Sequence, residues 1–255
     1  LLIFSIDSHL LMLYYYYYFF LLLVQHRCQL LLYQKFLTMH YTLLHFPEIK
    51  LQQSDGHKLR GYFAEAFGSD SDLYHNHDED GRSIYRYPHI QFKVIDHHPM
   101  IIGVDEGARL IMKRFLDIKE IVISQSIYRL DQKNISSQEI ELGIKVELYQ
   151  YTFESPWMAL NQSNHSKYMQ GDHTVRKNLL TSILTGNILS FYKSVECMIT
   201  DRILLTHDLR QITTNFKNTK MVAFKGSFVT NAILPDYIGL GKSVSRGYGA
   251  IRKTN

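Results

Sequence analysis

The chain has 255 residues, of which 45% are hydrophobic and 20% are charged, a balance that excludes a disordered or fibrous protein. Its formal net charge of +4 allows an anionic partner but excludes a strongly basic, histone-like tail. The two cysteines, Cys28 and Cys197, form no CxxC pair, which excludes a disulfide framework and a cysteine zinc site and favours a reducing cytoplasm.

The first 38 residues differ from everything that follows. The run from Leu10 to Val24 is uninterrupted apolar and aromatic sequence, but it has only 15 residues and carries its tyrosines in the middle. A membrane helix needs about 20 apolar residues, with tyrosines at its ends, and the basic start of a signal peptide is missing. We interpret residues 1–38 as non-native upstream translation or a disordered extension, with Met39 as the start, and keep a membrane segment as the alternative.

The first half of the remaining chain, residues 39–140, has the pattern strand, helix, strand, strand, helix, strand. We expect strands or extended segments at 41–51, 84–95, 100–104 and 120–128, helices at 55–67 and 105–116, and a polar loop at 69–82. Acidic residues begin the second helix, which suits a helix N-terminus. The polar stretch 131–139 is the best candidate for a linker.

The second half, residues 141–255, begins the same cycle again. Ile144, Val146 and Leu148 alternate with polar residues as in a strand, and a helix is expected at about 175–195 and a strand at 221–232. A glycine-rich segment and a last short strand follow. Two βαββαβ units in tandem predict an α+β protein of two ferredoxin-like (RRM-like) domains, a fold that does not by itself identify an activity.

The glycine-rich segment, Gly239 to Gly249, is the sharpest motif. Two Gly-x-Gly pairs enclose five residues that include Lys242, Ser243, Ser245 and Arg246. Backbone N–H groups in such a loop form an anion-binding concavity, and the cations and hydroxyls suit a phosphate backbone. A nucleotide P-loop is excluded because Asp236 stands where its first glycine would be, and GxGxxG spacing is absent. The alternative is a hairpin that only closes the last strand.

This segment, with Gly239, Gly241, Gly247 and Gly249 in place, resembles the C-terminal G-h-G-x5-G-h-G loop of the CRISPR repeat-RNA processing endoribonucleases, where h is hydrophobic. These enzymes belong to the RAMP superfamily of ferredoxin-like RNA-binding proteins. The resemblance extends from Met39 to Lys253. It implies cleavage of precursor CRISPR RNA within the repeat, without metal or other cofactor. It also implies repeat RNA as partner, with effector subunits or a homodimer as further partners and no membrane association.

His75 and His77 lie two residues apart in the polar loop. In an extended segment both side chains face the same side, roughly 6–7 Å apart, and histidine can act as acid or base near neutral pH. The resemblance implies a catalytic histidine pair with a nearby tyrosine, for which Tyr85 is chosen over the equally close Tyr74 and Tyr87. Metal binding with the carboxylates at 78–80 and an inert solvated loop are the alternatives.

Lys58 and Arg60 in the first helix are candidate RNA contacts, or simply part of an exposed charged face. The competing functions are a catalytically inactive RNA-binding subunit of an effector complex and, if residues 10–24 are expressed, a membrane-anchored protein.

Overall fold

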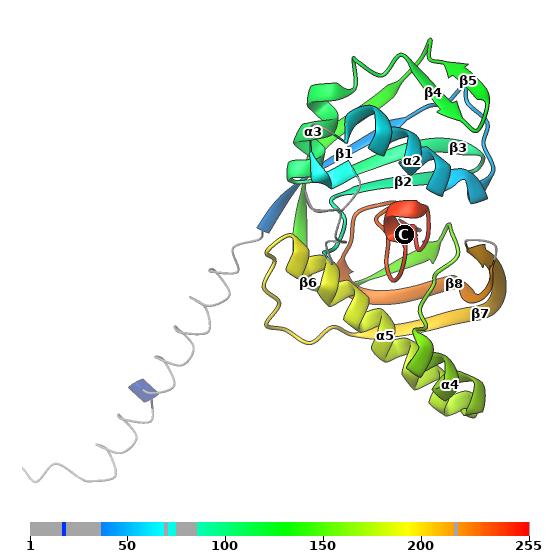
Figure 1. The fold of residues 1–255 in the computed structure, drawn as a ribbon. Helices are drawn as coiled ribbons and strands as arrows, with labels where there is room; N and C mark the ends of the chain where they lie inside the picture. The colour runs from blue at the N-terminus through cyan, green and yellow to red at the C-terminus, as the bar shows by residue number, and fades with distance from the viewer. Residues whose placement is uncertain (1–16, 19–36, 69–70, 75–85, 217–218, 255) are drawn as a thin grey trace, which may run out of the picture. The chain divides into compact units, whose positions relative to one another are not determined.

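The computed structural model describes residues 17–18, 37–68, 71–74, 86–216 and 219–254 (Figure 1). The chain divides into two compact units, Leu1–Phe36 and Leu37–Asn255, and the fold described below is that of the second. Among the helices that the structure describes, none is long and apolar enough to cross a membrane.

The N-terminal half has the expected ferredoxin-like order. Four antiparallel strands lie in the order β2-β3-β1-β6, and the helices α2 and α3 form the crossovers between them. Their bounds are β1 (Leu37–His45), α2 (Gly56–Phe67), β2 (Ile90–Ile95), β3 (His98–Val104), α3 (Glu106–Arg114) and β6 (Asn134–Phe153). Two short 3-10 helices, η1 (Gln53–Asp55) and η2 (Asp72–Tyr74), flank α2. The fold begins at Leu37, two residues before the expected boundary, because Leu37 and Thr38 already pair with β6.

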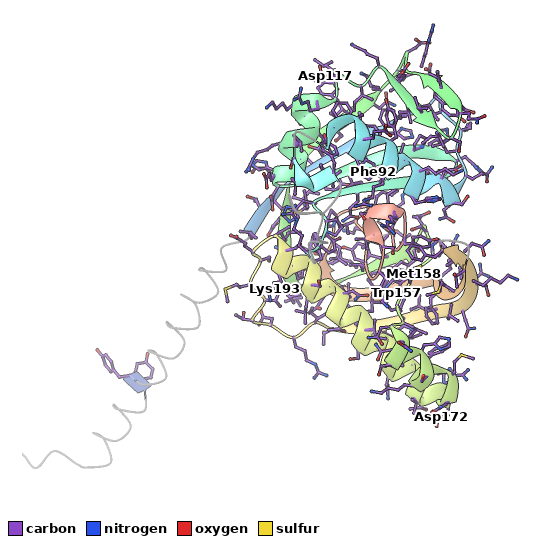
Figure 2. The ribbon with its side chains drawn as sticks, viewed as in Figure 1. Phe92, Asp117, Trp157, Met158, Asp172 and Lys193 are labelled. Atoms are coloured by element: carbon purple, nitrogen blue, oxygen red, sulfur yellow. The ribbon has the colours of Figure 1, made fainter. Side chains whose placement is uncertain are left out.

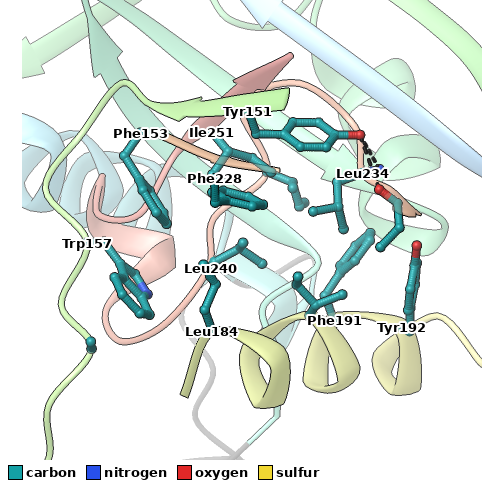
Figure 3. Close-up of a cluster of buried hydrophobic side chains, with 14 of the residues drawn as sticks. Tyr151, Phe153, Trp157, Leu184, Phe191, Tyr192, Phe228, Leu234, Leu240 and Ile251 are labelled. Carbon is teal, nitrogen blue, oxygen red and sulfur yellow. Dashed lines mark hydrogen bonds between the residues drawn. The ribbon is translucent and has the colours of Figure 1, made fainter. Parts of the chain in front are cut away.

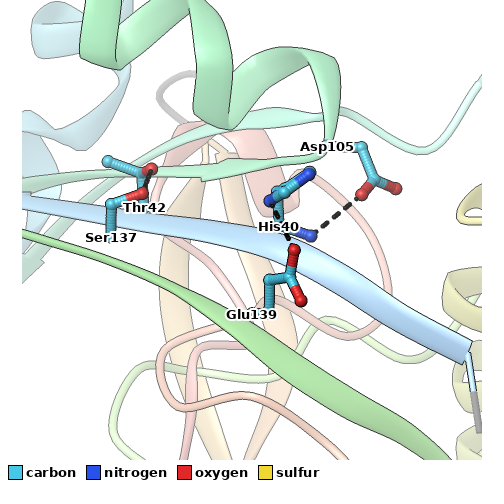
Figure 4. A network of polar contacts seen from close by, with 5 residues as sticks. All are labelled: His40, Thr42, Asp105, Ser137 and Glu139. Atoms are coloured by element: carbon cyan, nitrogen blue, oxygen red, sulfur yellow. Dashed lines mark hydrogen bonds and ion pairs between the residues drawn. The ribbon is translucent and has the colours of Figure 1, made fainter.

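The predicted linker at 131–139 is wrong. From Asn134 onward this stretch belongs to β6, the fourth strand of the first unit, while residues 120–128 form a separate hairpin of β4 (Glu120–Ile123) and β5 (Ser126–Arg129). Polar contacts join β6 to β1 across the pair (Figure 4): the hydroxyls of Thr42 and Ser137 lie 2.9 Å apart, and His40 Nδ1 lies 3.8 Å from Glu139. The side chains of this stretch are mostly exposed and polar, as in a linker, although its backbone pairs with β1.

The C-terminal half repeats the topology with one substitution. β6 continues into it, and the strands lie in the order β9-β6-β8-β7. The elements are α4 (Gln162–Gln170), α5 (His173–Ser194), β7 (Leu205–Phe216), β8 (Thr219–Ile233), η3 (Val244–Arg246) and β9 (Ile251–Lys253). The glycine-rich segment with η3 takes the place of the second crossover helix. The sequence patterns did not predict α4 or β7.

The larger core lies between α5 and the C-terminal sheet (Figure 3). Leu184, Ile188 and Phe191 recur at helical spacing and are fully buried, which explains why this stretch forms an amphipathic helix. The Tyr151 hydroxyl accepts a hydrogen bond from the Leu234 amide at 2.9 Å, and burial raises the pKa of Tyr151 to about 12. Leu240 of the glycine-rich segment is also buried here. The glycine-rich segment is therefore anchored in the core through the side chain of Leu240.

Candidate nucleic-acid interface

The glycine-rich segment, residues 239–249, folds back on itself and is called the glycine loop below. The Leu240 amide donates to the Gly249 carbonyl at 2.9 Å, and the Gly249 amide donates to the Pro156 carbonyl at 2.9 Å. Gly241, Gly247 and Gly249 have φ angles of +89°, +100° and +64°, which favour glycine. A Cβ on Gly249 would lie 1.9 Å from the Leu240 carbonyl oxygen. The glycines are therefore needed for the backbone of the loop to fold back and form these hydrogen bonds.

Replacing Gly249 with alanine should lower the free energy of unfolding by several kcal/mol, since the new methyl group overlaps a backbone oxygen and requires a positive φ. Gly186 in α5 is the matched control, because a Cβ there meets nothing within 4 Å. Gly186→Ala should stabilise the protein by about 0.5–1 kcal/mol. Urea unfolding of both variants measures the effects. Equal stability of Gly249→Ala and wild type would contradict the assigned loop geometry.

Three side chains from the β2 region hold the glycine loop. The Tyr87 hydroxyl donates to the Gly239 carbonyl at 2.6 Å, and the Gly239 amide donates to Gln91 Oε1 at 2.9 Å. The Lys93 ammonium donates to the carbonyls of Val244 and Tyr248 at 2.7 and 3.1 Å. Figure 2 labels Phe92 on β2 and Trp157 and Met158 after β6, and the loop packs between these segments. The loop thus joins the two halves.

Lys93 is fully buried, and desolvation holds its pKa well below the usual value. The pKa of Lys93 is lower in the folded protein than in the unfolded chain. At pH values between these two pKa values Lys93 is protonated only in the unfolded chain, so the free energy of unfolding rises with pH across this range and is lowest below it. The rise attributable to Lys93 is at most about 1.4 kcal/mol per pH unit. Urea unfolding of Lys93→Met at pH 7, 8 and 9 should show a smaller increase than wild type. Parallel curves would show that Lys93 does not titrate in this range.

The start of α2 packs directly under the loop. A Cβ on Gly56 would lie 2.8 Å from the Arg246 carbonyl oxygen, so only glycine allows this approach without movement. Arg60, one helical turn later, is half-buried, and its pKa is lowered first by burial and second by the charge of Arg246. The charges of two arginines from different elements are therefore near enough to repel each other. Neighbouring positive charges of this kind favour the binding of an anion.

Lys58 points elsewhere. Its ammonium pairs with Asp55 at 2.9 Å, and it lines a hollow of about 530 Å³ between α2 and β4. Residues two apart on a helix do not share a face. Of the two predicted cations in this helix, the structure brings only Arg60 to the glycine loop.

The β7–β8 hairpin contacts the loop from the C-terminal half. The Tyr248 hydroxyl donates to the Asn215 carbonyl at 2.6 Å, and the rings of Phe216 and Tyr248 meet edge to face at 5.8 Å. The guanidinium of Arg246 lies 5.9 Å from the centre of the Phe216 ring. Arg246 is therefore held beside an aromatic ring, a combination that suits a nucleic-acid backbone with its bases.

The remaining predicted loop residues lie at its surface. Lys242 is exposed, and its amide donates to the Met158 carbonyl at 3.0 Å. Ser243 has a left-handed φ of 57° and begins the turn η3, and Ser245 within that turn is partly exposed. Both hydroxyls and the Lys242 ammonium can contact a phosphate chain. The sequence did not predict the supporting residues Gly56, Tyr87, Gln91, Lys93, Asn215, Phe216 and Tyr248, although Lys93 stands out as a cation in an apolar strand.

The predicted catalytic residues His75, His77 and Tyr85 lie outside the described residues. The two alternative tyrosines have structural positions: Tyr74 is 3% exposed and packs against Phe67, and Tyr87 supports Gly239. In the part of the chain that the structure describes, no three His, Cys, Asp or Glu side chains gather closely enough to hold a metal ion. The acidic loop at 75–80 lies outside the described residues.

Comparison with protein families gives two adjacent matches. The Cas6b N-terminal domain matches residues 37–141, and the Cas6b C-terminal domain matches residues 143–254. The chain belongs to the Cas6b family. A crystal structure of a Cas6b protein is 37% identical with a TM-score of 0.82, and the match covers 86% of this chain and 100% of that one. These matches confirm the resemblance seen in the sequence.

Three further relatives have lower sequence identity to this chain. A second Cas6b structure, described as a CRISPR RNA processing endoribonuclease, is 32% identical with a TM-score of 0.70 and is matched over 100% of its chain and 86% of this one. An uncharacterized protein of Methanocaldococcus jannaschii is 32% identical over 139 residues, which are 53% of this chain and 93% of that protein. A Cas6 product complex with 10% identity and a TM-score of 0.56 shares the fold, over 85% of this chain and 99% of that one. The solved structures among these relatives confirm the tandem ferredoxin-like fold.

Proposed function

We propose that this Cas6b protein is an endoribonuclease that cuts precursor CRISPR RNA within the repeat. The observation that carries the proposal is the glycine loop, which is fixed by β2 and by the core so that Arg246 lies beside the Phe216 ring and within electrostatic range of Arg60. The description of the related Cas6b structure as a CRISPR RNA processing endoribonuclease supports the same activity. The bound RNA would run over the loop with a phosphate near the two guanidinium groups.

Cleavage is proposed to proceed by transesterification. The ribose 2′-oxygen attacks the adjacent phosphorus while a base removes the 2′-OH proton, and the bond from phosphorus to the 5′-oxygen breaks as an acid gives that oxygen a proton. The products are a 2′,3′-cyclic phosphate and a 5′-hydroxyl. We assign the two proton transfers to His75 and His77 and an accessory position to Tyr85, from their chemistry and spacing in the sequence.

The arginines contribute by a different principle. A phosphate that is attacked in line develops negative charge on its non-bridging oxygens, and preorganised guanidinium groups stabilise that charge. The charge of Arg246 lowers the pKa of Arg60, so the two arginines interact electrostatically in the free protein. A phosphate bound near both would be attracted by two positive charges at once.

The test is incubation of the protein with the repeat RNA of its own genome in EDTA, with products resolved by length and end chemistry. A single cut within the repeat that leaves a cyclic phosphate and a 5′-hydroxyl is the expected result. Binding without cleavage would replace the proposal by an inactive RNA-binding subunit. Cleavage that requires added Mg²⁺ or Mn²⁺ would overturn the metal-independent mechanism.

A further inference from the structure

Lys93 is a buried cation in the middle of a strand. Its side chain is 0% exposed, and its neighbours in the strand, Phe92 and Val94, are buried as well. Both of its hydrogen bonds go to backbone carbonyls of the glycine loop, those of Val244 and Tyr248. No carboxylate among the described residues pairs with it, and burial alone accounts for the lowered pKa.

A buried ammonium without a counter-ion destabilises the folded state, and a hydrophobic side chain of the same volume often destabilises it less. Perturbed titratable groups of this kind concentrate at functional sites, where the charge itself is used. The contacts of Gln91 and Tyr87 show that neutral groups can anchor the same loop. The positive charge of Lys93 is therefore unnecessary for anchoring alone.

The hydrogen bonds of Lys93 also orient the loop. A peptide unit is planar and trans, so its carbonyl and the following N–H point in opposite directions. Because the Val244 carbonyl points at Lys93, the Ser245 N–H points away from it. Ser245 and Arg246 are partly exposed, whereas Val244 is buried. A donor and a guanidinium are thus presented on the outer side of the turn, with an ammonium beneath it.

We propose that Lys93 is a positioning residue for RNA binding: its ammonium fixes the turn Val244–Arg246 from beneath, and its charge acts through the turn on an RNA phosphate bound at Ser245 and Arg246. The proposal rests on the proposed function, since it requires that RNA binds at the glycine loop. Attraction across one layer of buried backbone is screened less than attraction through water. Lys93 thereby assists RNA binding without touching RNA.

A measurable consequence is a proton linkage. A phosphate near Lys93 favours the charged form, so RNA binding raises the lowered pKa of Lys93 and takes up a proton at pH values between the free and bound pKa. RNA affinity should therefore fall as pH rises through this window, by up to about tenfold per pH unit for one proton. The other charged or titratable groups on the elements packed against Lys93 are Asp55, His57, Lys58, Arg60, Tyr62, Glu65, His98, Lys242, Arg246 and Tyr248. All of them remain in the variants described next.

The experiment measures the Kd of the protein for its repeat RNA, made uncleavable by a 2′-deoxy nucleotide at the mapped cut, from pH 6.5 to 9.5 at constant ionic strength. Lys93→Met removes the charge and keeps the volume. Gln91→Met is the matched control, because it removes another anchor of the same loop and no titratable group. At pH 7 we expect Lys93→Met to bind about tenfold more weakly than wild type, in line with the loss of one charge-assisted contact. The two curves should converge as pH rises, whereas Gln91→Met should weaken binding with the wild-type pH profile.

Two outcomes would overturn the proposal: a Lys93→Met curve parallel to wild type, or the same flattening of the pH profile in Gln91→Met. If Lys93→Met does not fold, calorimetry of wild type in two buffers with different ionisation enthalpies gives the answer, since no proton uptake between pH 6.5 and 9.5 would equally exclude the linkage. Failure of wild type to bind repeat RNA at all would instead overturn the proposed function. The two failures are therefore distinguishable.

Discussion

Replacing His75 or His77 with alanine is expected to slow cleavage of the repeat RNA by about 10²–10⁴-fold for each histidine, because each change removes one positioned proton transfer. RNA affinity should stay within about threefold of wild type, since the glycine loop and its arginines supply the phosphate contacts. Single-turnover cleavage and a separate binding measurement on the uncleavable RNA distinguish the two effects.

His165 provides the matched control for these variants. It is an exposed histidine on α4, and it has no role in the proposed mechanism. His165→Ala should cleave at the wild-type rate. If His75→Ala and His77→Ala also cleave at that rate, the acid–base assignment fails while the RNA-binding role of the loop remains. The double variant should lose little beyond the worse single variant, because residues that act as a unit are not additive.

Replacing Arg246 with glutamine is expected to weaken RNA binding by tenfold or more, which corresponds to the roughly 1.5–3 kcal/mol of a hydrogen bond to a charged group. The slope of log K against log salt should become shallower by about 0.7–0.9, because one fewer phosphate is neutralised. Lys167→Gln is the control, since this exposed lysine on α4 has no proposed RNA contact. An unchanged salt slope in Arg246→Gln would exclude RNA phosphate from this part of the loop.

The pair Arg60 and Arg246 allows a sharper form of the same test. If both contact one phosphate, the loss in the double variant Arg60→Gln/Arg246→Gln should differ from the sum of the single losses by about 0.5–3 kcal/mol, as expected for residues in one network. Strict additivity would place the two arginines at separate phosphates. Thermal unfolding of each variant shows whether loop packing against Phe216 has been lost as well.

Local pattern predicted those elements whose burial repeats with a regular period. The apolar face of α5 is an example, and α2 was expected within one residue of its observed bounds. The alternation from Ile144 does lie in a strand, β6, but it does not mark a buried face, because Val146 is 96% exposed and Leu148 is 57% exposed. The first part of β6 was missed because its side chains are mostly polar and exposed, and nothing local distinguishes it from a loop. β7 was missed although its burial alternates along the strand, because Leu205, Leu209 and Ile212 are only partly buried and stand among polar residues. Their strand form depends on hydrogen bonds to neighbours far away in the chain.

The sequence by itself determined the family, the doubled fold and the glycine loop, because glycine spacing and hydrophobic period are properties of neighbouring residues. Only the tertiary structure decided what the loop rests on. Lys93 is 151 residues from Val244 in the chain, and Arg60 is separated from Arg246 by most of the protein. These groups meet because two sheets joined through β6 bring β2 and α2 against the loop, and no local pattern encodes a contact at that separation.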